Sequence, residues 1–93
     1  MTLDIQYQKS ANKFFLKNSS ILTKVESNQL ITKAVKKLIK KEDINIDIKL
    51  LKGNLKKYYR IRSGKIRILF ELIDNEIKII AIVNDVDFRG NIY

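Results

Sequence analysis

Hydrophobic and polar residues alternate through residues 58–70, and this is the clearest pattern in the chain. Alternation of this kind predicts β-strands, and the Ser63-Gly64 pair that interrupts it predicts a two-residue hairpin turn. The alternate apolar positions are Tyr59, Ile61, Ile66, Ile68 and Phe70. The predicted turn would place Arg60 opposite Arg67, Arg62 opposite Lys65 and Tyr59 opposite Ile68.

A second hairpin is expected to follow, with its turn at Asp74-Asn75 and a third strand over residues 76–86. This turn would pair Glu71 with Lys78. One face of the resulting meander is apolar throughout, and we expect helices to cover it: Tyr59, Ile61, Ile66, Ile68, Phe70, Leu72, Ile77, Ile79, Ala81 and Val83. A smaller apolar group is expected on the reverse face: Leu69, Ile73, Ile80, Ile82 and Val86.

The first half of the chain predicts a strand and two helices. Residues 2–7 alternate as a short strand does, and a helix is expected to begin at Ser10 as its N-cap. A turn at residues 18–20 would lead to a second helix over about residues 21–40. The side chains expected to be buried on the two helices are Ala11, Phe14, Phe15, Ile31, Ala34, Val35, Leu38 and Ile39.

The segment between the helices and the hairpin carries weaker signals. Residues 42–47 are polar and are expected to be irregular, and residues 48–51 are expected to form an anchored connection to a turn at Gly53-Asn54. The prediction is therefore one α+β domain over residues 1–93. It consists of an N-terminal strand, a helical hairpin and an antiparallel three-stranded meander, with the helices packed on one face.

Composition limits the class of protein. The chain has 93 residues, of which 45% are hydrophobic, and it has no proline, as expected for one compact domain. It has no cysteine, which excludes disulfides and thiolate zinc sites. Its apolar runs are far shorter than the roughly 20 residues of a membrane span, and its N-terminus lacks the layout of a signal peptide. We therefore expect a cytoplasmic protein without membrane association.

The charge points to an anionic partner. Lys and Arg number 19 against 10 Asp and Glu, which gives a net charge of +9 and favours nucleic acid, an anionic surface or an acidic protein. Lysines are spread along the chain, whereas the four arginines all lie in its last third: Arg60, Arg62, Arg67 and Arg89. Arginine presents a planar fork of donors that matches a phosphate, so this distribution draws attention to the hairpin.

The hairpin is expected to carry a patch of cations on the face opposite the core. The patch comprises Arg60, Arg62, Lys65 and Arg67, with no carboxylate interspersed between them. Like charges opposite each other destabilise a sheet, so we interpret the patch as a polyanion site. Four residues before it could extend this site: Lys52, Lys56, Lys57 and Tyr58. The alternative is an ordinary solvated face on which the lysines only confer solubility and Tyr58 covers the sheet edge.

These residues form a pattern that resembles the RelE/ParE toxin superfamily, on its RelE-like side. The pattern is Leu51-Lys52-Gly53, then YRIR at residues 59–62, KIRILFEL at residues 65–72, a hydrophobic strand, and Arg89 followed by Tyr93. The resemblance covers nearly the whole chain. It implies a RelE-like fold and the toxin of a type II toxin–antitoxin pair, which cuts mRNA in the ribosomal A site and is neutralised by an acidic antitoxin.

The resemblance also implies the site residues. The family's active-site positions match Arg60, Arg62, Arg67, Arg89 and Tyr93, so that every arginine of the chain falls on one of them. Many relatives have histidine where this chain has Phe88, and glycine is common at the position of Asp87.

The chain contains no histidine and no cysteine, so the usual nucleophile–base pairs are excluded. Attack by a substrate 2′-hydroxyl on its neighbouring phosphate remains, and it needs neither metal nor cofactor. Together with the resemblance, this assigns Arg67 and Arg89 to the scissile phosphate, Arg60 to a second clamp and Arg62 to positioning. Tyr93 is a candidate acid or base whose pKa neighbouring cations would lower; the alternative is a C-terminal aromatic that only packs.

Three other functions stay open at this point. Asp85 and Asp87, two residues apart on a strand, could serve a magnesium nuclease, although no third ligand is evident. The ParE branch of the superfamily shares the fold and inhibits DNA gyrase, so the chain could instead be a gyrase inhibitor. A non-catalytic RNA-binding module would use the same basic face without needing Tyr93.

Overall fold

The computed structural model describes residues 2–51, 58–75 and 78–88. Its elements follow in the order β1 (Thr2–Tyr7), α1 (Lys9–Lys17), α2 (Lys24–Ile39), β2 (Asp47–Leu51), β3 (Tyr58–Ser63), β4 (Ile66–Asp74) and β5 (Lys78–Phe88). The turn expected at Gly53-Asn54 lies outside the described residues, as do Lys52, Lys56, Lys57, Arg89 and Tyr93.

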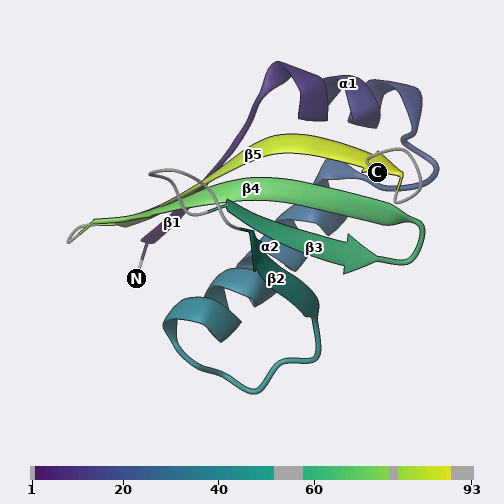
Figure 1. The fold of residues 1–93 in the computed structure, drawn as a ribbon. Coiled ribbons are helices and arrows are strands. Elements are labelled where there is room, and N and C mark those ends of the chain that lie inside the picture. Colours follow the sequence, from purple (N-terminus) through teal and green to yellow (C-terminus); the bar gives the residue numbers. More distant parts are fainter. Residues whose placement is uncertain (1, 52–57, 76–77, 89–93) are drawn as a thin grey trace.

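The strands of the described part form one five-stranded sheet in the order β1-β5-β4-β3-β2 (Figure 1). β1 runs parallel to β5, and the other neighbours are antiparallel. The α+β class, the first strand and the meander β3–β4–β5 agree with the prediction. The expectation of a connection at residues 48–51 was wrong, because Asp47–Leu51 form an edge strand paired with β3. Ile48 lies opposite Ile61 there, so the segment is tied to the sheet by both its backbone and its apolar residues.

The hydrophobic core lies between α2 and one face of the sheet, and α1 contributes to it beside β5 (Figure 1). Successive side chains of a strand point to opposite faces, so every second residue of the meander enters this core. Tyr59 and Phe70 are directly opposite each other on β3 and β4, and their stacked rings have centroids 5.6 Å apart. The buried apolar residues are Ala11, Phe14, Leu22, Ile31, Ala34, Val35, Tyr59, Ile61, Ile66, Ile68, Phe70, Ile79, Ala81, Val83 and Val86.

Both helices begin at positions other than those predicted. α2 begins at Lys24 because Thr23 caps it: the Thr23 Oγ1 accepts from the Glu26 backbone N–H, and the Glu26 side chain accepts from the Thr23 backbone N–H. α1 begins at Lys9, and Ser10 lies inside the helix, where its hydroxyl donates to the Asp85 carboxylate at 2.5 Å. In the described part, neither helix is long and apolar enough to span a membrane.

The first hairpin turns one residue later than predicted. Gly64 and Lys65 form the turn, and Ser63 is opposite Ile66. Gly64 has a φ of 56°, and the first central position of a type II′ turn favours glycine for this reason. The pairing therefore shifts by two residues along β4. A shift by two preserves the face of every side chain, so the predicted core face survives the wrong register.

The second hairpin has a longer loop than predicted and contains a bulge. Asp74 pairs with Ile79, so the expected pairing of Glu71 with Lys78 was wrong: Glu71 is opposite Ile82. Lys78 instead forms an ion pair with Asp4 on β1 at 3.9 Å. The register also slips between Leu69 and Phe70, which leaves one extra residue on β5.

The bulge changes which residues of β5 face the core. Val86 was expected on the reverse face, but it is opposite Ile68 and only 2% exposed in the core. Asp85 and Asp87 are opposite Leu69 and Arg67 instead. Without the extra residue, the strict alternation would direct both carboxylates toward the core, which is costly for a charge. The bulge therefore removes two acids from the core.

Candidate nucleic-acid interface

Three arginines lie on the sheet face opposite α2, which we call the arginine face and define by Arg60, Arg62 and Arg67. Their neighbours along the strands, among them Ile61 and Ile68, are buried in the core on the other side. Arg62 is directly opposite Arg67, whereas Arg60 is opposite Leu69. The expected pairing of Arg60 with Arg67 was therefore wrong, although all three arginines share the face that the alternation predicts.

Carboxylates flank these arginines on both sides, contrary to the expectation of a patch without acids. Asp47 on β2 is opposite Arg62, and Asp87 on β5 is opposite Arg67. Across four adjacent strands the row is therefore Asp87, Arg67, Arg62, Asp47. Two like charges at the centre of a sheet are tolerated more readily when opposite charges adjoin them. The outer acids thus reduce the repulsion that the arginine pair creates.

Asp47 contacts two of the arginines. Its Oδ2 accepts from the Arg62 Nε at 2.9 Å, and its Oδ1 lies 3.5 Å from the Arg60 Nη2. The Asp47 side chain is 50% exposed and that of Arg62 is 35% exposed, whereas the Arg60 side chain is only 7% exposed. One partly solvated carboxylate at the sheet edge therefore contacts one buried and one accessible guanidinium.

The arginine face also contains charged residues that are almost fully buried. Arg60, Arg67 and Glu71 are each 5% exposed. The Nε of Arg60 has no hydrogen-bond partner in the part of the chain that the structure describes. A guanidinium held in such a low-dielectric setting interacts more strongly with an anion than one in water does. The buried arginines are thus suited to electrostatic stabilisation of a phosphate.

Apolar residues adjoin the arginines on this face, toward the end away from the Gly64 turn. Ile73 is 42% exposed there. Glu71 lies in this apolar part, opposite Ile82 on β5 and Tyr58 on β3. The apolar residues that alternate with it on this face are Leu69, Ile73, Ile80 and Ile82. The face therefore combines a charged half with an apolar half.

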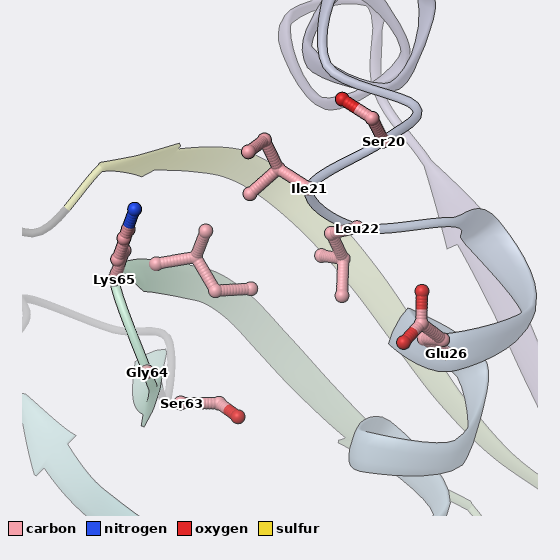
Figure 2. A pocket seen from close by; sticks show the side chains of 8 residues that line it. Ser20, Ile21, Leu22, Glu26, Ser63, Gly64 and Lys65 are labelled. Atoms are coloured by element: carbon pink, nitrogen blue, oxygen red, sulfur yellow. The ribbon is translucent and has the colours of Figure 1, made fainter.

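The other predicted site residues are only partly brought together. Tyr58 is half-buried at the start of β3. Lys65, expected beside Arg62 on the patch, is instead an exposed residue of the turn. It lines a pocket of about 360 Å³ between that turn and the segment joining the two helices, with Glu26 on another side of the pocket (Figure 2). Lys65 is therefore at the tip of the hairpin and not within the arginine row.

The end of β5 is close to the arginine row. Phe88, the last residue of β5, is opposite Ile66 and packs on Phe14 with ring centroids 5.4 Å apart. Phe88 is thus one pair beyond Arg67 toward the Gly64 turn. The side chain at position 88 belongs to the core side, so Phe88 serves packing.

The arrangement gives no support to a metal centre at Asp85 and Asp87. Among the described residues, no group of three or more His, Cys, Asp or Glu is placed to hold a metal ion. Asp85 accepts from the Ser10 hydroxyl, and the Asp87 Oδ1 accepts from the Phe88 backbone N–H at 2.8 Å. Both acids already have partners within the protein.

Asp47 is the residue of this interface that the sequence did not suggest. It enters the site because β2 pairs with β3, and β2 was not expected to be a strand. A signal was present: Ile46, Ile48 and Leu50 alternate with Asp47 and Lys49, as in a short strand with one charged face.

Comparison with known proteins supports the fold. No family model matches the chain, and no curated protein matches it in sequence. Solved structures match its shape. A metal-bound toxin from Helicobacter pylori aligns over 99% of this chain and 100% of its own, with a TM-score of 0.63 and 15% identity.

Two toxin–antitoxin complexes are similar as well. The archaeal RelE-RelB complex from Pyrococcus horikoshii matches with a TM-score of 0.61 and 19% identity, covering 98% of this chain and 99% of the other. The RelB-RelE complex from Methanococcus jannaschii matches with a TM-score of 0.52 and 22% identity, covering 95% and 94%. At these identities the comparison shows the fold, and the fold is RelE-like.

Proposed function

We propose that this chain, whose fold is that of the RelE toxins, is the toxin of a type II toxin–antitoxin pair and cleaves mRNA in the ribosomal A site. The observation that carries the proposal is the gathering of Arg60, Arg62 and Arg67 on one face of two adjacent strands. Arginine forks match phosphate oxygens, and an RNA target on the ribosome agrees with a net charge of +9.

The proposed reaction uses a nucleophile from the RNA itself. The 2′-oxygen attacks the adjacent phosphorus while its proton passes to a base, and a 2′,3′-cyclic phosphate forms. The bond from phosphorus to the 5′-oxygen breaks, and the leaving oxygen takes up a proton. The transition state concentrates negative charge on the phosphate oxygens, which buried guanidinium groups stabilise without reorganisation. This route requires no metal and no histidine.

Each residue has a distinct role in this proposal. Arg67, which is 5% exposed, and Arg89 stabilise the scissile phosphate. Arg60 supplies a second positive charge from a buried position, and the more accessible Arg62 positions the RNA backbone. Tyr93 acts as the acid or base that transfers a proton in this reaction. The outer contacts to RNA come from five residues that precede the hairpin in sequence or lie in its turn: Lys52, Lys56, Lys57, Tyr58 and Lys65.

An acidic antitoxin is the second proposed partner. The apolar half of the arginine face adjoins the charged half, so a segment with both acidic and apolar side chains would match it. Leu69, Ile80 and Ile82 supply the apolar contacts. Isothermal titration calorimetry against the product of the neighbouring open reading frame tests this partner. An absence of binding at micromolar concentrations would exclude it.

Primer extension on mRNA from cells expressing the protein tests the nuclease. We expect cleavages within translated codons that disappear in Arg67→Ala and persist in Lys33→Ala, which changes an exposed lysine of α2. Intact mRNA together with stalled DNA replication would instead identify a gyrase inhibitor. Tyr93→Phe separates an enzyme from an RNA-binding module, because it should slow cleavage and leave RNA affinity nearly unchanged. Equal losses of both would count against a catalytic tyrosine.

A further inference from the structure

Asp47 is placed on the arginines as an anionic ligand would be. Its two carboxylate oxygens are shared between two guanidinium groups, with Oδ2 at 2.9 Å from the Arg62 Nε and Oδ1 at 3.5 Å from the Arg60 Nη2. Two non-bridging phosphate oxygens of an RNA backbone would make the same kind of contact with the same donors.

We propose that Asp47 occupies the place of an RNA phosphate on Arg60 and Arg62 while no RNA is bound, and that RNA displaces it. The inference rests on the proposed function and extends it, because it identifies a built-in competitor for the substrate. Asp47 would then act as a regulatory residue and not as a catalytic one.

RNA can displace the Asp47 carboxylate from the arginines at little energetic cost. The Asp47 side chain is 50% exposed, so its carboxylate can be hydrated once it leaves the arginines. Exposed ion pairs contribute little net stability, since water competes for both partners. Asp47 is the first residue of edge strand β2, and residues 41–46 before it have no regular secondary structure. A rotation of its side chain therefore leaves the sheet intact.

The two acids of the row, Asp47 and Asp87, differ in the partners of their carboxylate oxygens. Asp87, opposite Arg67, has its Oδ1 bonded to the backbone N–H of Phe88 at 2.8 Å. Asp47 has both oxygens on arginine side chains. A carboxylate that competes for the accessible Arg62 reduces binding to any polyanion. In a protein with a net charge of +9, it would restrict unproductive binding to cellular RNA.

The test measures RNA binding by fluorescence anisotropy. The probe is a labelled ten-nucleotide RNA with 2′-O-methyl groups, which binds but cannot be cleaved. Asp47→Asn keeps the size of the side chain and removes its charge, so we expect the dissociation constant to fall about fivefold at low salt, since an ion pair no longer competes with RNA. The matched control is Asp43→Asn, an exposed acid nearby, which should change the constant less than about twofold.

A double-mutant cycle separates direct competition from a general charge effect. Asp47 competes with RNA mainly at the accessible Arg62. In an Arg62→Gln background, Asp47→Asn should therefore lower the dissociation constant for RNA by little more than Asp43→Asn does. An equal gain in both backgrounds, or the same gain from Asp43→Asn, would overturn the proposal. Weaker or unchanged binding by Asp47→Asn would overturn it too, because Asp47 would then only position the arginines.

An NMR measurement on the unsubstituted protein tests the proposal even if the Asp47→Asn variant does not fold. The NMR signal of the Arg62 Nε–H group should move when inorganic phosphate or the RNA probe is added, as the proton changes its acceptor. An unmoved signal at saturation would mean that Asp47 stays in place, and the proposal would fall. The proposed nuclease fails separately, if mRNA stays intact in cells that express the unsubstituted protein. Loss of cleavage in Arg67→Ala with no effect of Asp47→Asn removes only the present inference.

Discussion

Arg62 on β3 and Arg67 on β4 are directly opposite each other, and Asp47 and Asp87 are their outer neighbours in the same row. A sheet built only for stability gains nothing from two facing arginines. The arrangement places two arginines opposite each other on adjacent strands, with an acid on each outer flank of the row. Arg67 is 5% exposed and the Arg62 side chain 35%, so the pair offers one buried and one accessible donor group.

Replacing Arg67 by lysine tests whether its shape or only its charge matters. Lysine keeps the positive charge but loses the planar fork of donors, which in the proposed reaction stabilises the phosphate oxygens of the transition state. We expect Arg67→Lys to reduce the rate of mRNA cleavage by about tenfold to a hundredfold. RNA affinity should fall much less, because the charge remains. The two quantities are measured on the same preparation, by primer extension and by anisotropy.

Arg62→Lys is the comparison for this prediction. Because Arg62 is assigned to RNA positioning, the lysine variant should retain most of the cleavage rate. Equal losses in the two variants would contradict the separate roles assigned to the two arginines.

Placing a histidine at position 88, where many RelE-like toxins have one, should bring no gain in activity. Phe88 is opposite Ile66 and packs on Phe14, so a side chain at this position lies on the core side of the sheet and not among the arginines. We expect Phe88→His to lower the free energy of unfolding by about 1–2 kcal/mol, because an apolar contact is replaced by a polar ring. Cleavage per folded molecule should stay unchanged.

Chemical denaturation measures the stability of that variant, with Phe88→Leu as the apolar control. Faster cleavage by Phe88→His would show that the side chain at position 88 reaches the arginine face.

The side-chain pattern predicts the faces of the sheet better than it predicts the pairing. Alternation with period two determines which residues share a face, and the faces survive any error of two or four residues in the register. The first turn was misplaced by one residue and the second loop was too short, yet Arg60, Arg62 and Arg67 still share a face. The extra residue on β5 reverses the alternation of faces in the rest of the strand, so the sequence pattern placed Val86 on the reverse face instead of in the core.

Long-range pairing explains the remaining differences. β2 has only five residues, so its alternation is a weak signal, and its pairing with β3 makes it a strand. Asp47 reaches Arg60 and Arg62 across 13 and 15 positions of sequence, a separation at which local patterns carry no information. The start of α2 depends on a choice between nearby polar residues, and Thr23 caps the helix because Glu26 completes a capping box with it.

Removing the cap of α2 should destabilise the protein measurably. The Thr23 Oγ1 accepts from the Glu26 backbone N–H at 3.1 Å, and Glu26 Oε1 accepts from the Thr23 backbone N–H at 3.0 Å. We expect Thr23→Ala to reduce the free energy of unfolding by about 1 kcal/mol, because a donor at the helix start loses its acceptor. Ser19→Ala, at an exposed position of the preceding turn, is the control and should change stability by less than about 0.5 kcal/mol. Equal effects of the two substitutions would mean that the cap contributes nothing specific.

Tyr7 should make stability depend on pH in the alkaline range. Burial raises the pKa of Tyr7 above its ordinary value of 10.0, although the hydrogen bond with Ser27 lowers it in part. The Tyr7 hydroxyl donates to the Asn28 Oδ1 at 2.5 Å and is 3.0 Å from the Ser27 Oγ, so it ties β1 to α2. The folded protein therefore holds this proton more tightly than the unfolded chain does. The stability linked to the proton is fully present below pH 10 and is lost as the pH rises through the folded-state pKa.

Tyr7→Phe removes both the hydrogen bonds and the titration. At neutral pH the variant should be about 1–2 kcal/mol less stable, because the fully buried Ser27 loses a partner. Above pH 10 the difference between the two proteins should shrink, since only the unsubstituted chain loses the contribution of the Tyr7 proton. Urea denaturation of both proteins between about pH 7 and pH 11 measures the two effects, and the other tyrosines, common to both chains, cancel in the comparison. A difference that stays constant or widens across that range would show that the Tyr7 hydroxyl is not the group whose burial couples folding to pH.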